Sequence, residues 1–164
     1  MVFPLKELDK LLNKKFTRYE NKEDGYSLDI PLNWMHISNS DDFGDTFSDK
    51  DKQEGMLAVK ITSSLFHTLD QFADALATGL NIHDKNKLIS RQNIVVANFD
   101  AIEMSFNAKA DVGAKEKEAI MITCIVHDPK VERFVFVTYS ALKENYPKLK
   151  SIYEQAKKSL KLID

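Results

Sequence analysis

The chain has 164 residues with a formal net charge of −2; 43% of the residues are hydrophobic and 29% are charged. This length suits one domain with a sizeable core, so residues 1–164 are treated as a single domain, and the composition excludes a wholly disordered chain. The balanced charge excludes the concentrated positive surface on which nucleic-acid binding depends.

Residues 1–15 are expected to form an amphipathic helix, because Leu5, Leu8 and Leu12 fall on one stripe after Pro4. The segment lacks the basic start, the continuous apolar run and the small-residue cleavage site of a signal peptide. No stretch of the chain approaches the roughly 20 apolar residues that cross a bilayer. Two locations therefore stay open: the cytoplasm, or an extracytoplasmic site reached with an export signal upstream of the first residue.

A β-hairpin is predicted next, because the tight-turn pair Asp24–Gly25 separates two stretches with aromatic and apolar residues, 16–19 and 26–30. Pro31 ends the second strand, since proline has no N–H to donate to a strand ladder. Trp34 follows at the start of another extended segment. We expect its indole to pack under the sheet edge rather than bind a ligand.

Residues 38–54 are polar and acidic and show no alternation, which predicts a long acidic loop. The loop supplies the candidate surface for a protein partner, made by the carboxylates of Asp41, Asp42, Asp45, Asp49, Asp51 and Glu54. A calcium loop of the EF-hand type is disfavoured, because Glu54 and Lys60 stand where that motif needs glycine and glutamate. Residues 57–61 then alternate as a half-buried strand.

Two helices are expected in the rest of the chain. The first opens with a capping box, since Gln71 lies three residues after Thr68, and apolar residues continue at helical spacing to Leu80. The second begins near Pro147 and carries an apolar stripe that ends at Leu160. Its outer face is predicted to be solvated and basic, with Lys148, Lys150, Lys157, Lys158 and Lys161.

Four strands are predicted between these two helices. Residues 87–96 and 101–109 are expected to pair as a hairpin, while residues 118–127 and 132–140 are apolar on both faces. A strand that is apolar on both faces must be covered on both faces, so the last two strands are predicted to be central. The hairpin-length turns make the pairing antiparallel. We therefore predict an α+β fold, an α/β/α sandwich whose central, mainly antiparallel sheet is flanked by helices on both faces.

Two parts of the chain resemble the PsbP-like family. Between Tyr19 and Trp34, the pattern Gly25-Tyr26-Ser27, then Pro31, then Trp34 is similar to the opening of such domains. Between Asn93 and Ile163 the order of strands and final helix is also similar, including Tyr139-Ser140-Ala141. The resemblance implies the sandwich shared with Ran-binding Mog-type proteins and a role in binding rather than chemistry. The acidic stretch and the arginine-poor composition favour the bacterial or archaeal lipoprotein branch, or an uncharacterised one, over a photosystem subunit.

No catalytic, cofactor-binding or metal site is expected. The histidines, which are His36, His67, His83 and His127, include no pair at a metal-ligand spacing. No serine lies in a nucleophile elbow, and no glycine-rich loop could cradle a phosphate. The lone cysteine, Cys124, excludes an intramolecular disulfide, and its mid-strand position predicts a buried, unreactive thiol.

The expected function is a non-enzymatic protein-binding or accessory domain, the folded part of an exported lipoprotein. The alternative is a cytoplasmic adaptor or chaperone that binds a client segment through the N-terminal helix and a face of the sheet. An enzyme is the third interpretation, and it requires a deep pocket that unites histidines with carboxylates. The acidic 39–54 stretch and the lysine-rich 143–161 stretch would steer a partner if both stay exposed. Partner identity and oligomeric state are not predicted.

Overall fold

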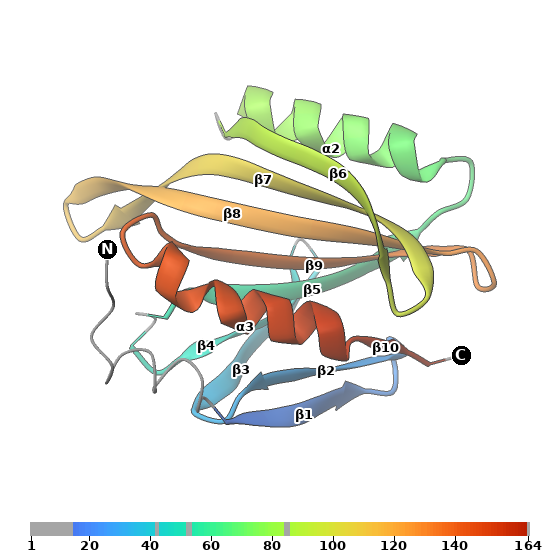
Figure 1. Ribbon diagram of the computed structural model, residues 1–164, viewed down its shortest axis with the longest axis horizontal. Helices are drawn as coiled ribbons and strands as arrows, with labels where there is room; N and C mark the ends of the chain where they lie inside the picture. Colours follow the sequence, from blue (N-terminus) through green and yellow to red (C-terminus); the bar gives the residue numbers. More distant parts are fainter. Residues whose placement is uncertain (1–14, 42, 52–53, 84–85, 164) are drawn as a thin grey trace.

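The computed structural model describes residues 15–41, 43–51, 54–83 and 86–163, with the side chains of residues 82, 83, 148 and 149 left aside. Two antiparallel sheets form its frame (Figure 1). The smaller has the order β1-β2-β10, from β1 (Phe16–Asn21), β2 (Tyr26–Pro31) and β10 (Lys161–Leu162). The larger has the order β3-β4-β5-β9-β8-β7-β6, from β3 (Trp34–Ser40), β4 (Gly44–Asp49), β5 (Met56–Ser63), β6 (Lys87–Val96), β7 (Phe99–Val112), β8 (Lys115–Asp128) and β9 (Arg133–Leu142).

The two strands predicted to be central are central. β8 lies between β7 and β9, and β9 lies between β8 and β5, with every pairing antiparallel. Their side chains alternate between two apolar clusters: Cys124 belongs to one, and the next residue, Ile125, belongs to the other. Burial on both sides explains why these strands are apolar at almost every position.

Each cluster includes one helix. Helix α3 (Tyr146–Ser159) contributes Ile152 and Tyr153 to the cluster that contains Cys124. Helix α2 (Leu69–His83) contributes Ala73 to the cluster that contains Ile125. Neither helix in the described part of the chain is long and apolar enough to cross a membrane.

The local signals for α2 and for the first hairpin are confirmed. The Thr68 N–H donates to Gln71 Oε1 at 2.9 Å, and the Gln71 N–H donates back to Thr68 Oγ1 at 3.1 Å, which is the capping box. Gly25, with φ +77°, follows β1 and precedes β2, and the residue pairs run from Phe16 opposite Pro31 to Asn21 opposite Tyr26. Glycine adopts this left-handed conformation without the steric cost of a side chain.

The prediction of one long acidic loop at residues 38–54 is wrong. β3 extends to Ser40, and β4, which lies entirely within the predicted loop, pairs with both β3 and β5. β4 has no apolar alternation, yet the stretch from Asp45 to Ser48 is buried. The side chains of Asp45 and Ser48 are hydrogen-bonded there, so their burial costs little. Of the predicted helix at residues 1–15, all but Lys15 lies outside the described residues.

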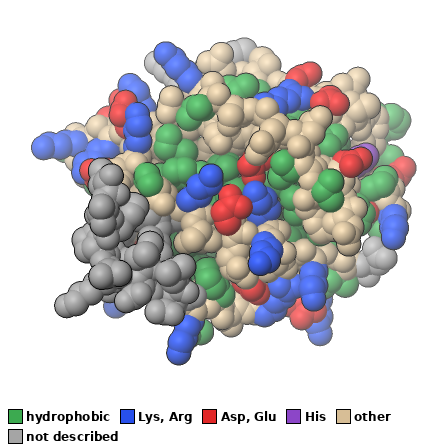
Figure 2. Space-filling model, in the orientation of Figure 1, with side chains coloured by type: hydrophobic (Ala, Val, Ile, Leu, Met, Phe, Trp, Pro, Cys, Tyr) green, Lys and Arg blue, Asp and Glu red, His purple; other side chains and the backbone are tan. Residues whose placement is uncertain are grey.

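The side of the molecule on which α3 lies carries a mixed surface. Figure 2 shows lysine and arginine side chains interspersed with acidic and apolar ones over the described part of this face. Lys157, predicted to belong to a solvated basic face, has a side chain only 18% exposed and contacts Glu103. The predicted lysine face of α3 is therefore partly neutralised within the fold.

Candidate functional site

The acidic residues predicted to form one surface are separated by the fold. Asp41 and Asp51 are exposed, but they lie beyond opposite ends of β4. Asp49 is half-buried, and its Oδ1 accepts the Glu54 N–H at 3.0 Å. Asp45 is buried, and Asp42 lies outside the described residues. The exposed carboxylates that remain therefore belong to two different turns.

Glu54 anchors the turn between β4 and β5. Its Oε1 accepts hydrogen bonds from Asn33 Nδ2 at 2.9 Å and from Trp34 Nε1 at 3.2 Å. Its backbone carbonyl accepts the Tyr139 hydroxyl at 2.6 Å. Trp34 is 6% exposed and packs in the core as predicted, with its indole N–H satisfied by this carboxylate.

Asp45 is the centre of a polar cluster that joins the two sheets. Its carboxylate is 2% exposed and accepts hydrogen bonds from donors on β1, β2 and β3: Asn21 Nδ2 at 2.7 Å, Asn39 Nδ2 at 2.8 Å, the Tyr26 hydroxyl, and the ring of His36 through Nε2 at 2.8 Å. Burial alone would raise the pKa of Asp45, but these hydrogen bonds together hold it below its ordinary value. Burial raises the pKa of Tyr26, and the bond to Asp45 raises it further, so the phenol stays a neutral donor.

The cluster around Asp45 has a structural role. His36 is 38% exposed, and its ring stacks on Tyr19 with centroids 5.7 Å apart. No group of three histidine, cysteine or acidic side chains in the described residues is placed to hold a metal ion. The imidazole and the carboxylate are already engaged with each other, and no nucleophile accompanies them. Their arrangement fixes β1 and β2 against β3 and β4.

A second polar cluster surrounds Glu103 on β7, which is 7% exposed. Its carboxylate accepts hydrogen bonds from Tyr153 Oη at 2.7 Å, Lys157 Nζ at 2.7 Å and Gln92 Nε2 at 2.9 Å. Burial opposes ionisation of Glu103, but these donors, Lys157 foremost, keep its pKa below the usual value. The cluster ties α3 to β6 and β7.

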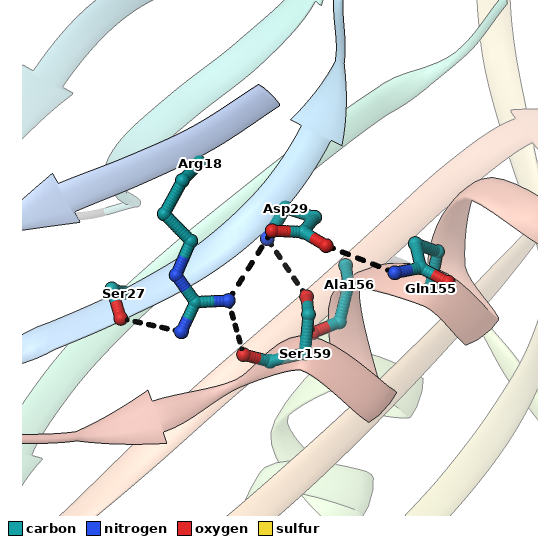
Figure 3. Close-up of polar contacts among 6 residues, drawn as sticks. All are labelled: Arg18, Ser27, Asp29, Gln155, Ala156 and Ser159. Carbon is teal, nitrogen blue, oxygen red and sulfur yellow. Dashed lines mark hydrogen bonds and ion pairs between the residues drawn. The ribbon is translucent and has the colours of Figure 1, made fainter. Parts of the chain in front are cut away.

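The small sheet is joined to α3 by Arg18 (Figure 3). Its guanidinium donates to Ser27 Oγ at 2.8 Å, to Asp29 Oδ1 at 3.2 Å and to the Ser159 carbonyl at the end of α3 at 2.7 Å. Asp29 in turn accepts Gln155 Nε2 at 2.9 Å. Every charged group in this cluster has a partner from the fold, so it serves the assembly of the domain.

Cys124 is buried as predicted. Burial raises the pKa of its thiol to about 12, with the nearby Glu103 carboxylate adding to the effect. Reactivity requires the thiolate, so this cysteine is inert in the folded protein.

The candidate binding site is an open groove beside α2, of about 920 Å³. Its floor is mainly apolar and comes from β5, β7, β8 and β9, while the turns on either side of β4 contribute to its rim. The lining includes Phe43, Asp51, Met56, Ala108, Asp111 and Met121. Phe43 is 69% exposed, which is unusual for a phenylalanine.

Sequence reasoning found one groove residue, Asp51, and missed the apolar ones. The alternation of β7 indicates one shared face from Ile102 to Ala108, and Ala110 and Val112 continue that row into the groove. The alternation does not indicate that the far end of the row is left uncovered. Phe43 carried no periodic signal, since it lies in the turn between β3 and β4.

Three comparisons place this fold among known proteins. A family model, PsbP, matches residues 14–162. A search of curated proteins found no match. Three solved structures are similar. Cyanobacterial PsbP (CyanoP) from Synechocystis sp. PCC 6803 has a TM-score of 0.66 and 14% identity, over 91% of this chain and 93% of that one. The Ran-binding protein Mog1p of Saccharomyces cerevisiae has a TM-score of 0.66 and 8% identity, over 93% of this chain and 97% of that one. LpqN of Mycobacterium tuberculosis, described as involved in cell envelope biogenesis, has a TM-score of 0.62 and 9% identity, over 99% of this chain and 98% of that one. At these identities the structural likeness establishes the fold alone.

Proposed function

Because this chain belongs to the PsbP family, we propose that it is a non-enzymatic accessory domain that binds a partner protein in the groove beside α2. The observation that carries the proposal is the groove itself: an apolar floor with an exposed Phe43 on its rim. Exposed aromatic side chains at the edge of an apolar patch are typical of protein-interaction sites. The Ran-binding structural neighbour supports a protein as the ligand.

Asp51 stays in the proposed contact surface, and Asp41 is a peripheral member of it. Asp45 does not belong to it, because its carboxylate is enclosed by four donors and has no capacity left for a partner. The acidic contribution to binding is therefore smaller than the sequence alone predicts.

We infer further that α2 and α3 form outer layers on opposite faces of the large sheet. The alternation of Cys124 and Ile125 between the two helix-containing clusters supports this arrangement, since adjacent residues of a strand point to opposite faces. With α3 on one face, the uncovered part of the other face, beside α2, is left for a partner.

The cellular setting we prefer is the folded part of an exported lipoprotein, and the alternative is a cytoplasmic adaptor or chaperone. The gene upstream of codon 1 decides between them. An apolar export stretch that ends at a lipid-modifiable cysteine supports the lipoprotein, and a start codon at this position with no such stretch supports the adaptor.

Affinity capture from the native host tests the proposed surface. The double variant Phe43→Ser/Asp51→Asn is compared with Val95→Ser/Asp100→Asn, because Val95 has the same 69% exposure and lies opposite exposed Asp100 on β6 and β7. We expect the groove variant to lose a protein that the wild type and the matched variant both retain. Equal capture by all three proteins would refute the assignment of the groove.

A further inference from the structure

We propose that the groove receives an amphipathic helix of the partner protein, with leucine-sized side chains along one face and basic residues on its flank. The inference rests on the proposed function and specifies the partner that the groove accepts. Its basis is the sheet face on which the groove lies, the backbone pairing of the floor strands and the charge of the rim.

The sheet face that forms the groove already carries a helix. Ala73 of α2 clusters with Ile102, Met104 and Phe106 of β7. The same face of β7 continues as Ala108, Ala110 and Val112, and these three residues line the groove. The face therefore packs against a helix along part of its length, and no other described segment of the chain covers the rest.

The lengths of the elements explain the open part. β7 and β8 each have 14 residues, or about 48 Å at ~3.4 Å per residue. α2 has 15 residues, or about 22 Å at 1.5 Å per residue. The chain then leaves the helix, where the Asn86 N–H donates to the Leu80 carbonyl at 3.1 Å, and Asn86 itself lines the groove. The groove thus begins where α2 ends.

Small residues give the floor its depth. Ala108 lies opposite Ala119, so two methyl groups stand where larger side chains would fill the layer. Met56 and Met121 lie on either side of Ser140 across three neighbouring strands. Methionine adapts its shape to the side chain that it contacts, which suits a surface that packs against a partner's leucines.

The floor offers side chains rather than backbone hydrogen bonds. β8 is paired with β7 and β9, and β9 is paired with β8 and β5, so the backbone groups of these strands are engaged within the sheet. Residues 108–112 of β7 are paired with β8 on one side only, because the pairing with β6 ends at Asn107, so free backbone groups lie at that edge and not on the face. An extended peptide would find few partners for its own N–H and C=O groups on such a face. A helix satisfies those groups internally and presents an apolar stripe, which is the helix-in-groove mode of recognition.

The charge on the rim selects a basic flank. Asp51 and Asp111 are both exposed and line the groove, and neither has an ion-pair partner within the described part of the chain. Asp111 contributes from the margin of β7, because its side chain alternates with those of Ala110 and Val112. Lys109, also on the rim, pairs with Glu116 at 3.2 Å. Among the described residues that line the groove, the charges without an ion-pair partner are therefore negative, and lysine or arginine on the flank of the bound helix complements them.

The test uses the full chain and fluorescence anisotropy with a labelled 18-residue synthetic peptide. The probe has leucines at i, i+3, i+4 and i+7 repeats and lysines on the flanking positions. Two matched peptides have the same leucines in scrambled order, or glutamates in place of the lysines. We expect saturable binding of the first peptide, and binding weaker by about tenfold or more for both others.

Protein variants locate the binding. Asp51→Lys/Asp111→Lys should lower the affinity for the lysine peptide by about tenfold or more. Asp100→Lys changes an exposed acid at the start of β7 and should leave that affinity unchanged. No saturable binding, equal binding of the scrambled peptide, or equal affinities of the two variants would overturn the inference.

The chain's own N-terminal segment is the competing occupant. If Leu8→Asp/Leu12→Asp raises the affinity for the lysine peptide by about tenfold, that segment occupies the groove, and the assignment to a partner is overturned. Unchanged affinity supports the partner. If the peptides fail while Phe43→Ser/Asp51→Asn still loses the host protein, the helical partner is rejected and the proposed function is retained.

Discussion

Replacement of Asp45 by asparagine should lower the free energy of unfolding by about 2–4 kcal/mol, because it weakens charge-assisted hydrogen bonds and leaves buried donors without an acceptor. The carboxylate is 2% exposed and accepts four hydrogen bonds. Hydrogen bonds to a charged group contribute about 1.5–3 kcal/mol each, but asparagine keeps one acceptor oxygen, so the loss is less than their sum. The new amide N–H₂ also faces donors that it cannot accept from.

Urea unfolding measures this change as a shift in the midpoint at constant slope. Asp24→Asn is the matched control, because Asp24 is exposed and accepts a single side-chain hydrogen bond, from Asn21. It should stay within about 0.5 kcal/mol of the wild type. A loss of less than about 1 kcal/mol for Asp45→Asn would show that the cluster does not hold the two sheets together.

The pH dependence of the same pair of proteins provides an independent check. The pKa of Asp45 is lowered in the folded state, so its stabilisation is present above the unfolded value of about 3.9 and is lost as the pH falls through the folded value. The stability gap between wild type and Asp45→Asn should therefore narrow as the pH falls below about 4. A gap that stays constant from pH 7 to pH 3 would contradict the role assigned to the ionised carboxylate.

Three further changes test other parts of the fold. Lys157→Ala should lower the free energy of unfolding by about 2–4 kcal/mol, because it leaves the Glu103 carboxylate without its cation. Lys158→Ala should lower it by less than about 0.5 kcal/mol. Equal losses of stability for the two variants in thermal unfolding would refute this difference. The Cys124 thiol should not react with a disulfide reagent at pH 8 until urea unfolds the chain; reaction in the native state would contradict its burial. Gly44→Ala should destabilise by at least about 1 kcal/mol, because φ is +71° and the new Cβ would collide with the carbonyl oxygen of Val59 on β5. A midpoint of urea unfolding that does not change would exclude this constraint.

Elements with a strong local signal were predicted correctly from the sequence. The capping box placed the start of α2, and the Asp24–Gly25 pair placed the first hairpin, because both depend on contacts between residues a few positions apart. The two-sided apolar pattern of β8 and β9 identified them as central strands. The two-residue strand β10 near the C-terminus was not predicted, because two residues are too few to show a periodicity.

The candidate site was predicted much less well. The groove combines Phe43 from one turn with Met56 from β5 and Met121 from β8. No pattern in the sequence indicates that these three residues lie close together. Asp51 was identified as part of a contact surface because it belongs to an acidic stretch, but the fold separates the members of that stretch.

By itself, the sequence determined both described helices and the strands other than β4 and β10, the central position of the most apolar strands and the likeness to the PsbP family, because these follow from residue periodicity and short motifs. Only the tertiary structure decided that β4 is a strand and that Asp45 is buried. An unpatterned polar segment is buried when donors from distant strands satisfy it, and Asn21, Tyr26 and Asn39 do so here. The groove was decided at the same level, since it exists where α2 ends before the sheet that it covers.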